Sequence, residues 1–516
     1  MGWRGGWVVS LLVVGVGCGG GLEDTEAEAA LAQEPTQALD PSVTQESFCP
    51  PTAAATQRVK TILPPSELGI PRFAAAPNSF VDFRGALHFA VNFEDGRGSL
   101  WKSTGTEAGT TQVKDFPAAP TFSSNVSRLT ATPTQLFFQA PDATHGHELW
   151  VSDGTGVGTR LVKDLTPGVE GSSLAHLKAM GNDLVFFREV FDEAASATRH
   201  ELWRSDGTDT GTVRLRDFGP TVDVSFLDAK TGNAMLFFVR ELEGATSLWR
   251  TDGTASGTIQ VKRLDAGPNT YPSELRATAT LALFTLSEST GLTELWKSDG
   301  TAGGTVRLAS FGASRVVQVL GALGTSAYVT TTSRTTQYMV IYRVPLAGGN
   351  PTPVVTLPND YAAQGSAFPR INAVSGAPGG TKLFFSVDIG SNSPAPTDTQ
   401  LWVTNGTAGG TTLLRRPLSL SDEYGSPVYA VADNLVYFSA PDTSGENIEP
   451  WVSNGTTGGT RQLKDIAPPS VGASSFPREF FRVGSRVFFS AYDETRAGQL
   501  WSSALTHTCA APEVGQ

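Results

Sequence analysis

The sequence predicts an all-β fold, a β-propeller of about nine four-stranded blades. Eight of the ten tryptophans recur in one phrase, at intervals of 46 to 53 residues with one double interval of 106. Short runs of aromatic and β-branched residues alternate with segments rich in Gly, Asn, Asp and Pro, which is typical of short strands joined by turns. A fixed period of about fifty residues indicates a propeller or a solenoid.

Each repeat has the same parts in the same order. An aromatic run such as LFFQA at 136–140 is followed by ELW or a relative of it, then by a Gly/Thr-rich loop and a strand such as TRLVKDL at 159–165. A Pro/Ser-rich connection and a short strand lead into the next repeat. Four short antiparallel strands per repeat make a propeller blade. Tyr342 stands where the double interval lacks its tryptophan, so nine blades are expected, or eight if this degenerate repeat forms none.

The two ends of the chain predict how the ring closes. The last repeat stops after QLWSSALTHTC at 499–509, without its closing strand, whereas TQRVKTIL at 56–63 has the form of that strand and no repeat of its own. We therefore expect the N-terminal strand to complete the last blade, which removes exposed sheet edges. Cys49 and Cys509 flank this junction, and we expect a disulfide between them in an oxidising compartment.

The first residues predict export. The apolar run Trp7–Val16 follows Arg4 and is too short to span a bilayer, so residues 1–18 read as a signal peptide. Cys18 follows small residues and resembles the lipid-accepting cysteine of bacterial lipoproteins, although Gly15 replaces the usual leucine; an ordinary secretory signal is the alternative. Residues 19–48 hold seven acids and no Lys or Arg, which predicts a disordered tether, and residues 49–516 form the propeller. The expected location is the cell envelope, on the outer membrane or the cell surface, through a lipid anchor.

The recurring phrase resembles the ELWxxDGT repeat of bacterial exported proteins over residues 56–505. That resemblance implies a propeller-like repeat fold and no established activity. The third residue after tryptophan is Asp in four repeats and Asn in two, and this exchange preserves a turn but weakens an acid catalyst or a calcium ligand. Structural turns are accordingly expected at Asp153, Gly154, Asp206, Gly207, Asp252, Gly253, Asp299, Gly300, Asn405 and Asn454, and blade-core positions at Trp101, Trp150, Trp203, Trp249, Trp296, Trp402, Trp451 and Trp501.

Candidate ligands for a metal are few. His145 and His147 lie two residues apart beside Glu148, and His200 precedes Glu201, but no third ligand is evident in either place. No nucleophile elbow, P-loop or zinc motif occurs, so we expect no catalytic, cofactor or metal residues, although a pair assembled from distant blades stays open. The net charge of −12 argues against nucleic acid as a partner.

Three functions remain. The first is a surface lipoprotein that serves as a protein- or glycan-binding scaffold, acting as a monomer with an unknown ligand. The alternatives are a propeller enzyme of the lyase, glycosidase or quinoprotein type with its site at the central channel, and a purely structural envelope protein. Ligand specificity would lie in the irregular repeats, residues 320–357 and the insertion at 388–400.

Overall fold

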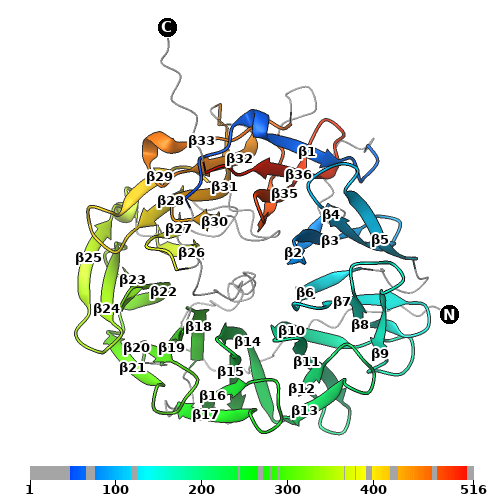
Figure 1. Ribbon diagram of the computed structural model, residues 1–516. Coiled ribbons are helices and arrows are strands. Elements are labelled where there is room, and N and C mark those ends of the chain that lie inside the picture. Colours follow the sequence, from blue (N-terminus) through cyan, green and yellow to red (C-terminus); the bar gives the residue numbers. More distant parts are fainter. Residues whose placement is uncertain are drawn as a thin grey trace, which may run out of the picture.

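The computed structural model is a ring of nine four-stranded antiparallel sheets, arranged like blades around a central axis (Figure 1). It describes residues 47–65, 76–118, 125–241, 245–264, 271–278, 280–288, 290–364, 367–377, 379–390, 398–418, 428–442, 444–445, 447–467 and 474–507. The predicted all-β propeller is confirmed, with nine blades rather than eight.

Each blade is a meander of four strands that starts at the axis and ends at the rim. Blades one to four comprise β2 (Asn78–Phe83), β3 (Ala86–Asn92), β4 (Gly98–Ser103), β5 (Thr110–Phe116); β6 (Ser127–Ala131), β7 (Leu136–Asp142), β8 (Gly146–Ser152), β9 (Arg160–Lys163); β10 (Ser173–Met180), β11 (Asp183–Asp192), β12 (Ala197–Ser205), β13 (Val213–Asp217); and β14 (Val222–Thr231), β15 (Ala234–Glu241), β16 (Thr246–Thr251), β17 (Ile259–Leu264). Blades five to eight comprise β18 (Tyr271–Ala277), β19 (Ala282–Ser287), β20 (Thr293–Ser298), β21 (Val306–Phe311); β22 (Arg315–Leu323), β23 (Ser326–Ser333), β24 (Met339–Pro345), β25 (Thr352–Leu357); β26 (Pro369–Ser375), β27 (Leu383–Ile389), β28 (Asp398–Thr404), β29 (Thr412–Arg415); and β30 (Val428–Ala432), β31 (Leu435–Pro441), β32 (Ile448–Ser453), β33 (Thr460–Gln462). Blade nine comprises β34 (Arg478–Val483), β35 (Arg486–Tyr492), β36 (Gly498–Ala504) and β1 (Thr56–Lys60). Three short 3₁₀ turns complete the regular structure described, at Ala53–Ala55, Ala362–Gln364 and Thr457–Gly459.

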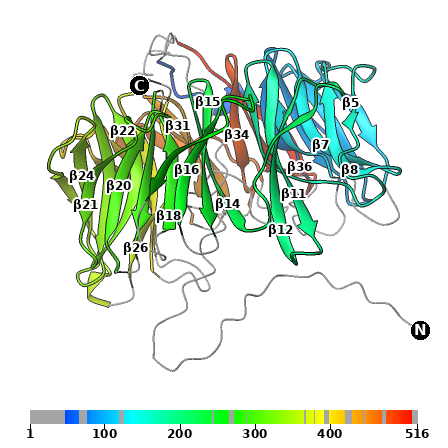
Figure 2. The same ribbon diagram turned by 90° about the horizontal axis from the view of Figure 1, so that it is seen from below.

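The paired phenylalanines of the second strand explain why blades stack. Successive side chains of a strand point to opposite faces. Phe137 accordingly packs into the cluster shared with blade three, and Phe138 packs into the cluster shared with blade one; both are fully buried. The described residues form nine such apolar clusters, one between each pair of neighbouring blades. Side by side, the blades form a disc whose strands run through its thickness (Figure 2).

The recurring aromatic of the third strand lies in these clusters too. Each of the eight tryptophans, and Tyr342 in blade six, packs in or against the cluster between its own blade and the preceding one. Trp150, Trp402, Trp451 and Trp501 are buried, and the other four tryptophans are half-buried. Tyr342 lies on β24 of a complete four-stranded sheet, with its ring 6.0 Å from that of Phe311, so the degenerate repeat still forms a blade.

The ring closes through the N-terminal strand. β1 pairs antiparallel with β36, and Thr56 lies opposite Ser503 with their hydroxyls 3.0 Å apart. Arg58 forms ion pairs at 2.8 Å with Asp493 and 2.6 Å with Glu494. The predicted closure is therefore confirmed, although the strand is shorter than the 56–63 segment named from the sequence.

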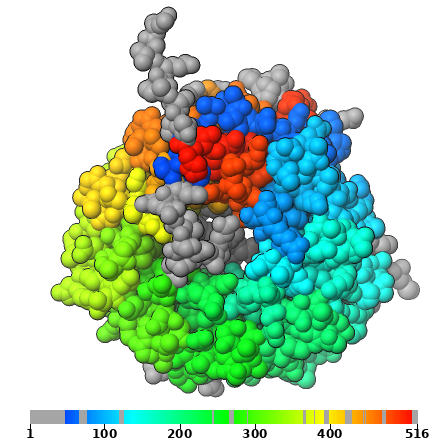
Figure 3. All heavy atoms as spheres, in the orientation of Figure 1, coloured from blue at the N-terminus to red at the C-terminus, as the bar shows by residue number. Residues whose placement is uncertain are grey.

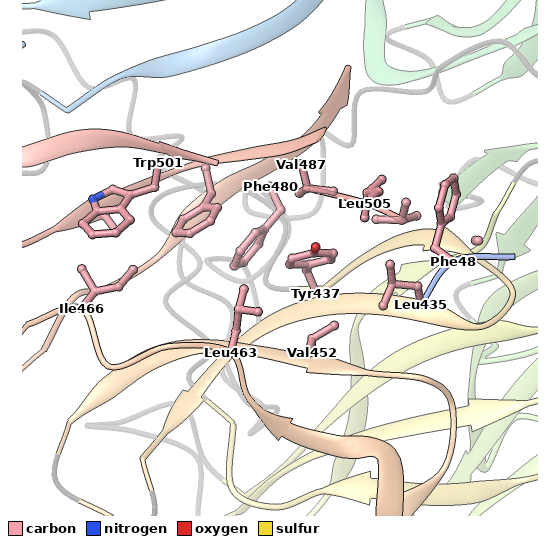
Figure 4. Close-up of a cluster of buried hydrophobic side chains, with 14 residues drawn as sticks. Phe48, Leu435, Tyr437, Val452, Leu463, Ile466, Phe480, Val487, Trp501 and Leu505 are labelled. Carbon is pink, nitrogen blue, oxygen red and sulfur yellow. The ribbon is translucent and has the colours of Figure 1, made fainter. Parts of the chain in front are cut away.

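The segment before β1 is fixed as well. Phe48 is buried in the cluster between blades eight and nine, at the opposite end from Trp501 (Figure 4). Cys49 forms an isolated bridge with Thr506, its N–H donating to the Thr506 carbonyl at 2.8 Å. Cys49 is disulfide-bonded in the structure. The signal peptide, Cys18, most of the acidic segment and Cys509 lie outside the described residues.

Candidate functional site in the channel wall

The loop that carries Asp-Gly-Thr is held by its own hydrogen bonds. In blade two, Asp153 Oδ1 accepts from the backbone N–H of Thr155 at 2.8 Å and from its hydroxyl at 2.7 Å. Asn405 Oδ1 makes the same two bonds to Thr407, at 3.1 and 2.8 Å. Only a side-chain oxygen is needed, which accounts for the exchange of Asp and Asn between repeats. The same pair of bonds recurs at Asp206, Asp252, Asp299 and Asn454.

Two further features of this loop, the hydroxyl residue before Asp and the second glycine, are explained by hydrogen bonding and close packing. In blade two the residue before Asp is Ser152. Its hydroxyl oxygen lies 2.7 Å from the hydroxyl oxygen of Thr159 and accepts from the N–H of Gly154 at 3.0 Å. A β-carbon on the second glycine, Gly158, would lie 2.1 Å from Asp153 Oδ1. The whole phrase is therefore accounted for by the packing of one hairpin loop, including the Ser/Thr pair that sequence reasoning missed.

Each loop also rests on a neighbouring blade. Arg84, in the turn between β2 and β3, donates to the carbonyls of Thr134 at 2.8 Å and Asp153 at 3.4 Å in blade two. Lys102 donates to the Gly154 carbonyl at 3.1 Å. The turns between first and second strands and the Asp-Gly-Thr loops therefore lie on one face of the disc, which we call the turn face.

The glutamate of ELW is structural in two different ways. Glu201 accepts from the indole N–H of Trp203 at 3.0 Å and pairs with Arg214. Glu449 is fully buried and instead accepts from the Ile466 N–H at 2.9 Å and the Ser475 hydroxyl at 2.8 Å. Burial raises the pKa of Glu449 to about 7. In both cases the carboxylate satisfies groups within the blade and faces no open space.

The histidines do not assemble a metal site. His145 Nδ1 lies 2.9 Å from Asp142, and His200 is buried with its Nε2 3.8 Å from Asp223. His147 lies on β8, half-buried. No group of three or more His, Cys, Asp or Glu suited to a metal occurs within the described part of the chain. Within the same residues, no helix is long and apolar enough to cross a membrane.

The innermost strands differ in charge from the rest of the chain. The nine strands β2, β6, β10, β14, β18, β22, β26, β30 and β34 together hold eight Lys or Arg and five Asp or Glu, a net charge of +3. The whole protein has a net charge of −12. These inner strands therefore carry a net positive formal charge within an acidic molecule, and a positive field raises the local concentration of anions. Figure 3 shows the disc hollowed at its centre.

Blades three to five carry the densest group of these charges. Asp228 on β14 faces blade three, where His176 Nδ1 lies 2.7 Å away and Lys178 Nζ 3.0 Å away. Lys230, two residues further on β14, makes no hydrogen bond or ion pair with any described residue. Burial and repulsion by Lys178 lower the pKa of Lys230. An anion that bound beside Lys230 would stabilise the charged form of this side chain.

Blade five extends the group along the wall. Arg276 on β18 has a buried Nε with no hydrogen-bond partner among the described residues. Glu274, on the same strand, accepts from the Val319 N–H of blade six and lies close enough to Arg276 to interact with it. Burial raises the pKa of Glu274 to about 7, so near neutral pH this acid offsets only part of the neighbouring positive charge. Lys178, Lys230 and Arg276 together form what we call the channel cations.

None of the channel cations was predicted from the sequence. Each lies one or two residues before the end of its inner strand, at intervals of 52 and 46 residues. The sequence does contain a pattern that could have indicated them: a basic residue recurs just before the first turn of three successive repeats. The chemistry that these groups support is electrostatic binding of a carboxylate or a phosphate.

Comparisons with known proteins give structural likenesses only. No family model and no curated protein matches the chain. Among solved structures, the chain is similar to prolyl endopeptidases (TM-score 0.42, 11% identity, 74% of this chain and 54% of that one) and to puromycin hydrolase (TM-score 0.38, 13% identity, 78% and 62%). It is also similar to the β-propeller domain of the Trilobed protease from Pyrococcus furiosus (TM-score 0.36, 12% identity, 66% and 98%).

These likenesses correct one expectation. The prediction of a cell-envelope lipoprotein that serves as a protein- or glycan-binding scaffold is wrong on this comparison, because the propellers found belong to peptidases and a hydrolase. The chain spans about half the length of the prolyl endopeptidases and acylaminoacyl peptidases it matches, at 54% and 52%. At such low identity we take no activity for this chain from them.

Proposed function

We propose that the protein is a propeller that binds a small anionic ligand, one carrying carboxylate or phosphate groups, in its central channel at blades three to five. The observation that carries this proposal is incomplete pairing of two cations there: Lys230 has no partner among the described residues, and Arg276 leaves a buried Nε unbonded. A ligand anion would supply the missing partners.

The test compares two lysines that carry the same charge in different places. Lys230→Met should weaken binding of succinate or inorganic phosphate by about tenfold in a low-salt titration, since one charge-assisted contact contributes on the order of 1.5 kcal/mol. Lys60→Met, on the outer strand β1, removes the same charge from the rim and should leave binding unchanged. Succinate and phosphate are titrated separately, which tells the two ligand chemistries apart.

Melting temperatures of both variants verify that each is folded. Equal losses of affinity in the two variants would assign the effect to net charge rather than to a site. Unchanged binding in Lys230→Met, or no binding of either anion to the parent protein at low salt, would show that the channel cations do not form an anion site.

We also propose that the disulfide partner of Cys49 is Cys509. The bridge between Cys49 and Thr506 supports this pairing, because it holds the chain at 506 beside Cys49, three residues before Cys509. Peptide mapping under non-reducing conditions should recover the two cysteines in one linked peptide. A linked peptide that joins Cys49 to Cys18 instead, or alkylation of Cys509 before reduction, would contradict the pairing.

A further inference from the structure

Four successive blades share an irregularity in the strand that lines the channel. In each of the inner strands β34, β2, β6 and β10, two residues lie opposite a single phenylalanine of the second strand, which is a β-bulge. The first residue of each bulge has a φ between 53° and 59°; these residues are Glu479, Ser79, Arg128 and His176. Positive φ is uncommon for residues other than glycine, so its recurrence at one position marks a shared backbone feature.

In blade one, this bulge binds a carboxylate. Glu479 of blade nine accepts hydrogen bonds from the backbone N–H groups of Ser79 and Phe80 on β2. Burial raises the pKa of Glu479, and these two bonds act in the opposite direction. Successive backbone N–H groups beside a residue of positive φ form a concave site for an anion. The side chain of the first bulge residue of one blade therefore reaches the bulge of the next blade.

Side chains reach from one inner strand to the next around the ring. His176 holds the position of Glu479 in its own bulge, and its Nδ1 lies 2.7 Å from Asp228 Oδ1 on the inner strand of blade four. Arg128 lies within electrostatic range of Glu189 in blade three. From blade five to blade nine, an inner-strand side chain accepts from a backbone N–H of the following inner strand: Glu274 from Val319, Gln318 from Ile371, Ser375 from Ala430 and Tyr429 from Arg482.

Blade two departs from this arrangement. The residue of blade one that is equivalent to Glu479 is Ser79, and its short side chain donates to Asn78 Oδ1 at 3.1 Å instead. Among the described residues, no side chain accepts from the N–H groups of Arg128 and Leu129, which form the bulge of blade two. Arg128 is exposed, and Ser79 and Leu129 are half-buried, so solvent reaches this part of the channel wall.

From these observations we infer that the bulge of blade two binds the carboxylate of an external ligand through the N–H groups of Arg128 and Leu129, as blade one binds Glu479. This site is separate from the channel cations of blades three to five, so it goes beyond the proposed function. Hydrogen bonds to an ionised acceptor are roughly twice as strong as those between neutral groups. Because the donors belong to the backbone, the site depends on bulge geometry and needs no excess of cationic side chains.

The experiment uses a reciprocal pair of substitutions in the full chain, with acetate as the probe at low salt. Every variant also carries Lys230→Met, so that the site proposed at blades three to five contributes little. Ser79→Glu gives blade one the residue that blade nine has at this position. Its carboxylate should occupy the bulge of blade two and weaken acetate binding by about tenfold or more. Glu479→Ser makes the opposite exchange, frees the bulge of blade one, and should add a second acetate site.

A third variant controls for charge. Ser127→Glu adds the same charge one residue before the bulge of blade two, and successive side chains of a strand point to opposite faces, so acetate affinity should stay nearly unchanged. Melting temperatures verify that each variant is folded. Equal losses in Ser79→Glu and Ser127→Glu would reduce the effect to local repulsion and overturn the site.

The remaining outcomes separate this inference from the proposed function. No acetate binding to the Lys230→Met protein, undiminished binding after Ser79→Glu, or no added site in folded Glu479→Ser would each overturn the bulge site. If Glu479→Ser does not fold, the comparison of Ser79→Glu with Ser127→Glu decides alone. The proposed function is tested independently, by comparing Lys230→Met with the parent protein.

Discussion

Deleting residues 49–63 should lower the melting temperature far more than deleting residues 19–46. The first deletion removes strand β1 with the buried Val59 and Leu63, and it leaves the edge of β36 unpaired. Each buried aliphatic side chain contributes about 2–4 kcal/mol, so the loss is on the order of 5 kcal/mol or more. That is comparable to the whole stability of an average domain.

The deletion of residues 19–46 is the control, and we expect it to leave the fold intact. It stops before Phe48, whose contacts with Asn434 and Arg482 stay in place. Thermal unfolding of the two variants is the measurement, together with gel filtration, because an exposed strand edge promotes association. Equal midpoints would show that blade nine is stable with three strands and that closure adds little.

The sequence predicted this closure because the evidence for it is local and repeated. The period of the tryptophans and the spare strand at 56–63 both follow from comparing repeats with one another. The same comparison indicated the role of Asp-Gly-Thr, where Asn405 and Asn454 reproduce the geometry of Asp153. Patterns of this kind are visible because each repeat is one supersecondary unit.

The channel could not be predicted in the same way. Lys178, Lys230 and Arg276 come from three different blades, and what makes them a group is the ring geometry. Their pairing also differs, because Lys178 is paired with Asp228 whereas Lys230 is paired with no described residue. Burial and pairing are tertiary quantities, and a charge on a strand is more often a solvated surface group. The proposed site therefore became visible only once the inner strands were placed side by side.

The glycine of Asp-Gly-Thr offers the second large effect, and a matched pair isolates its cause. Gly406 and Gly253 hold the same place in their loops and have φ values of 83° and 86°. A β-carbon on Gly406 would lie 2.2 Å from the Tyr328 hydroxyl oxygen and 2.4 Å from ring atom Cζ. On Gly253 the nearest atom would be 3.6 Å away, on the Val185 side chain.

Gly253→Ala should therefore cost only the strain of positive φ, about 1–2 kcal/mol. Gly406→Ala should cost that strain plus an overlap with a stiff, buried ring, about 1–3 kcal/mol more, because Tyr328 is only 6% exposed and has little room to move. Denaturant unfolding measures both. In a Tyr328→Leu background the overlap is absent, so Gly406→Ala should then cost no more than Gly253→Ala does. If the two alanine variants were equally destabilised in the parent protein, the loop would not depend on close approach to the preceding blade, and the glycine would serve backbone conformation alone.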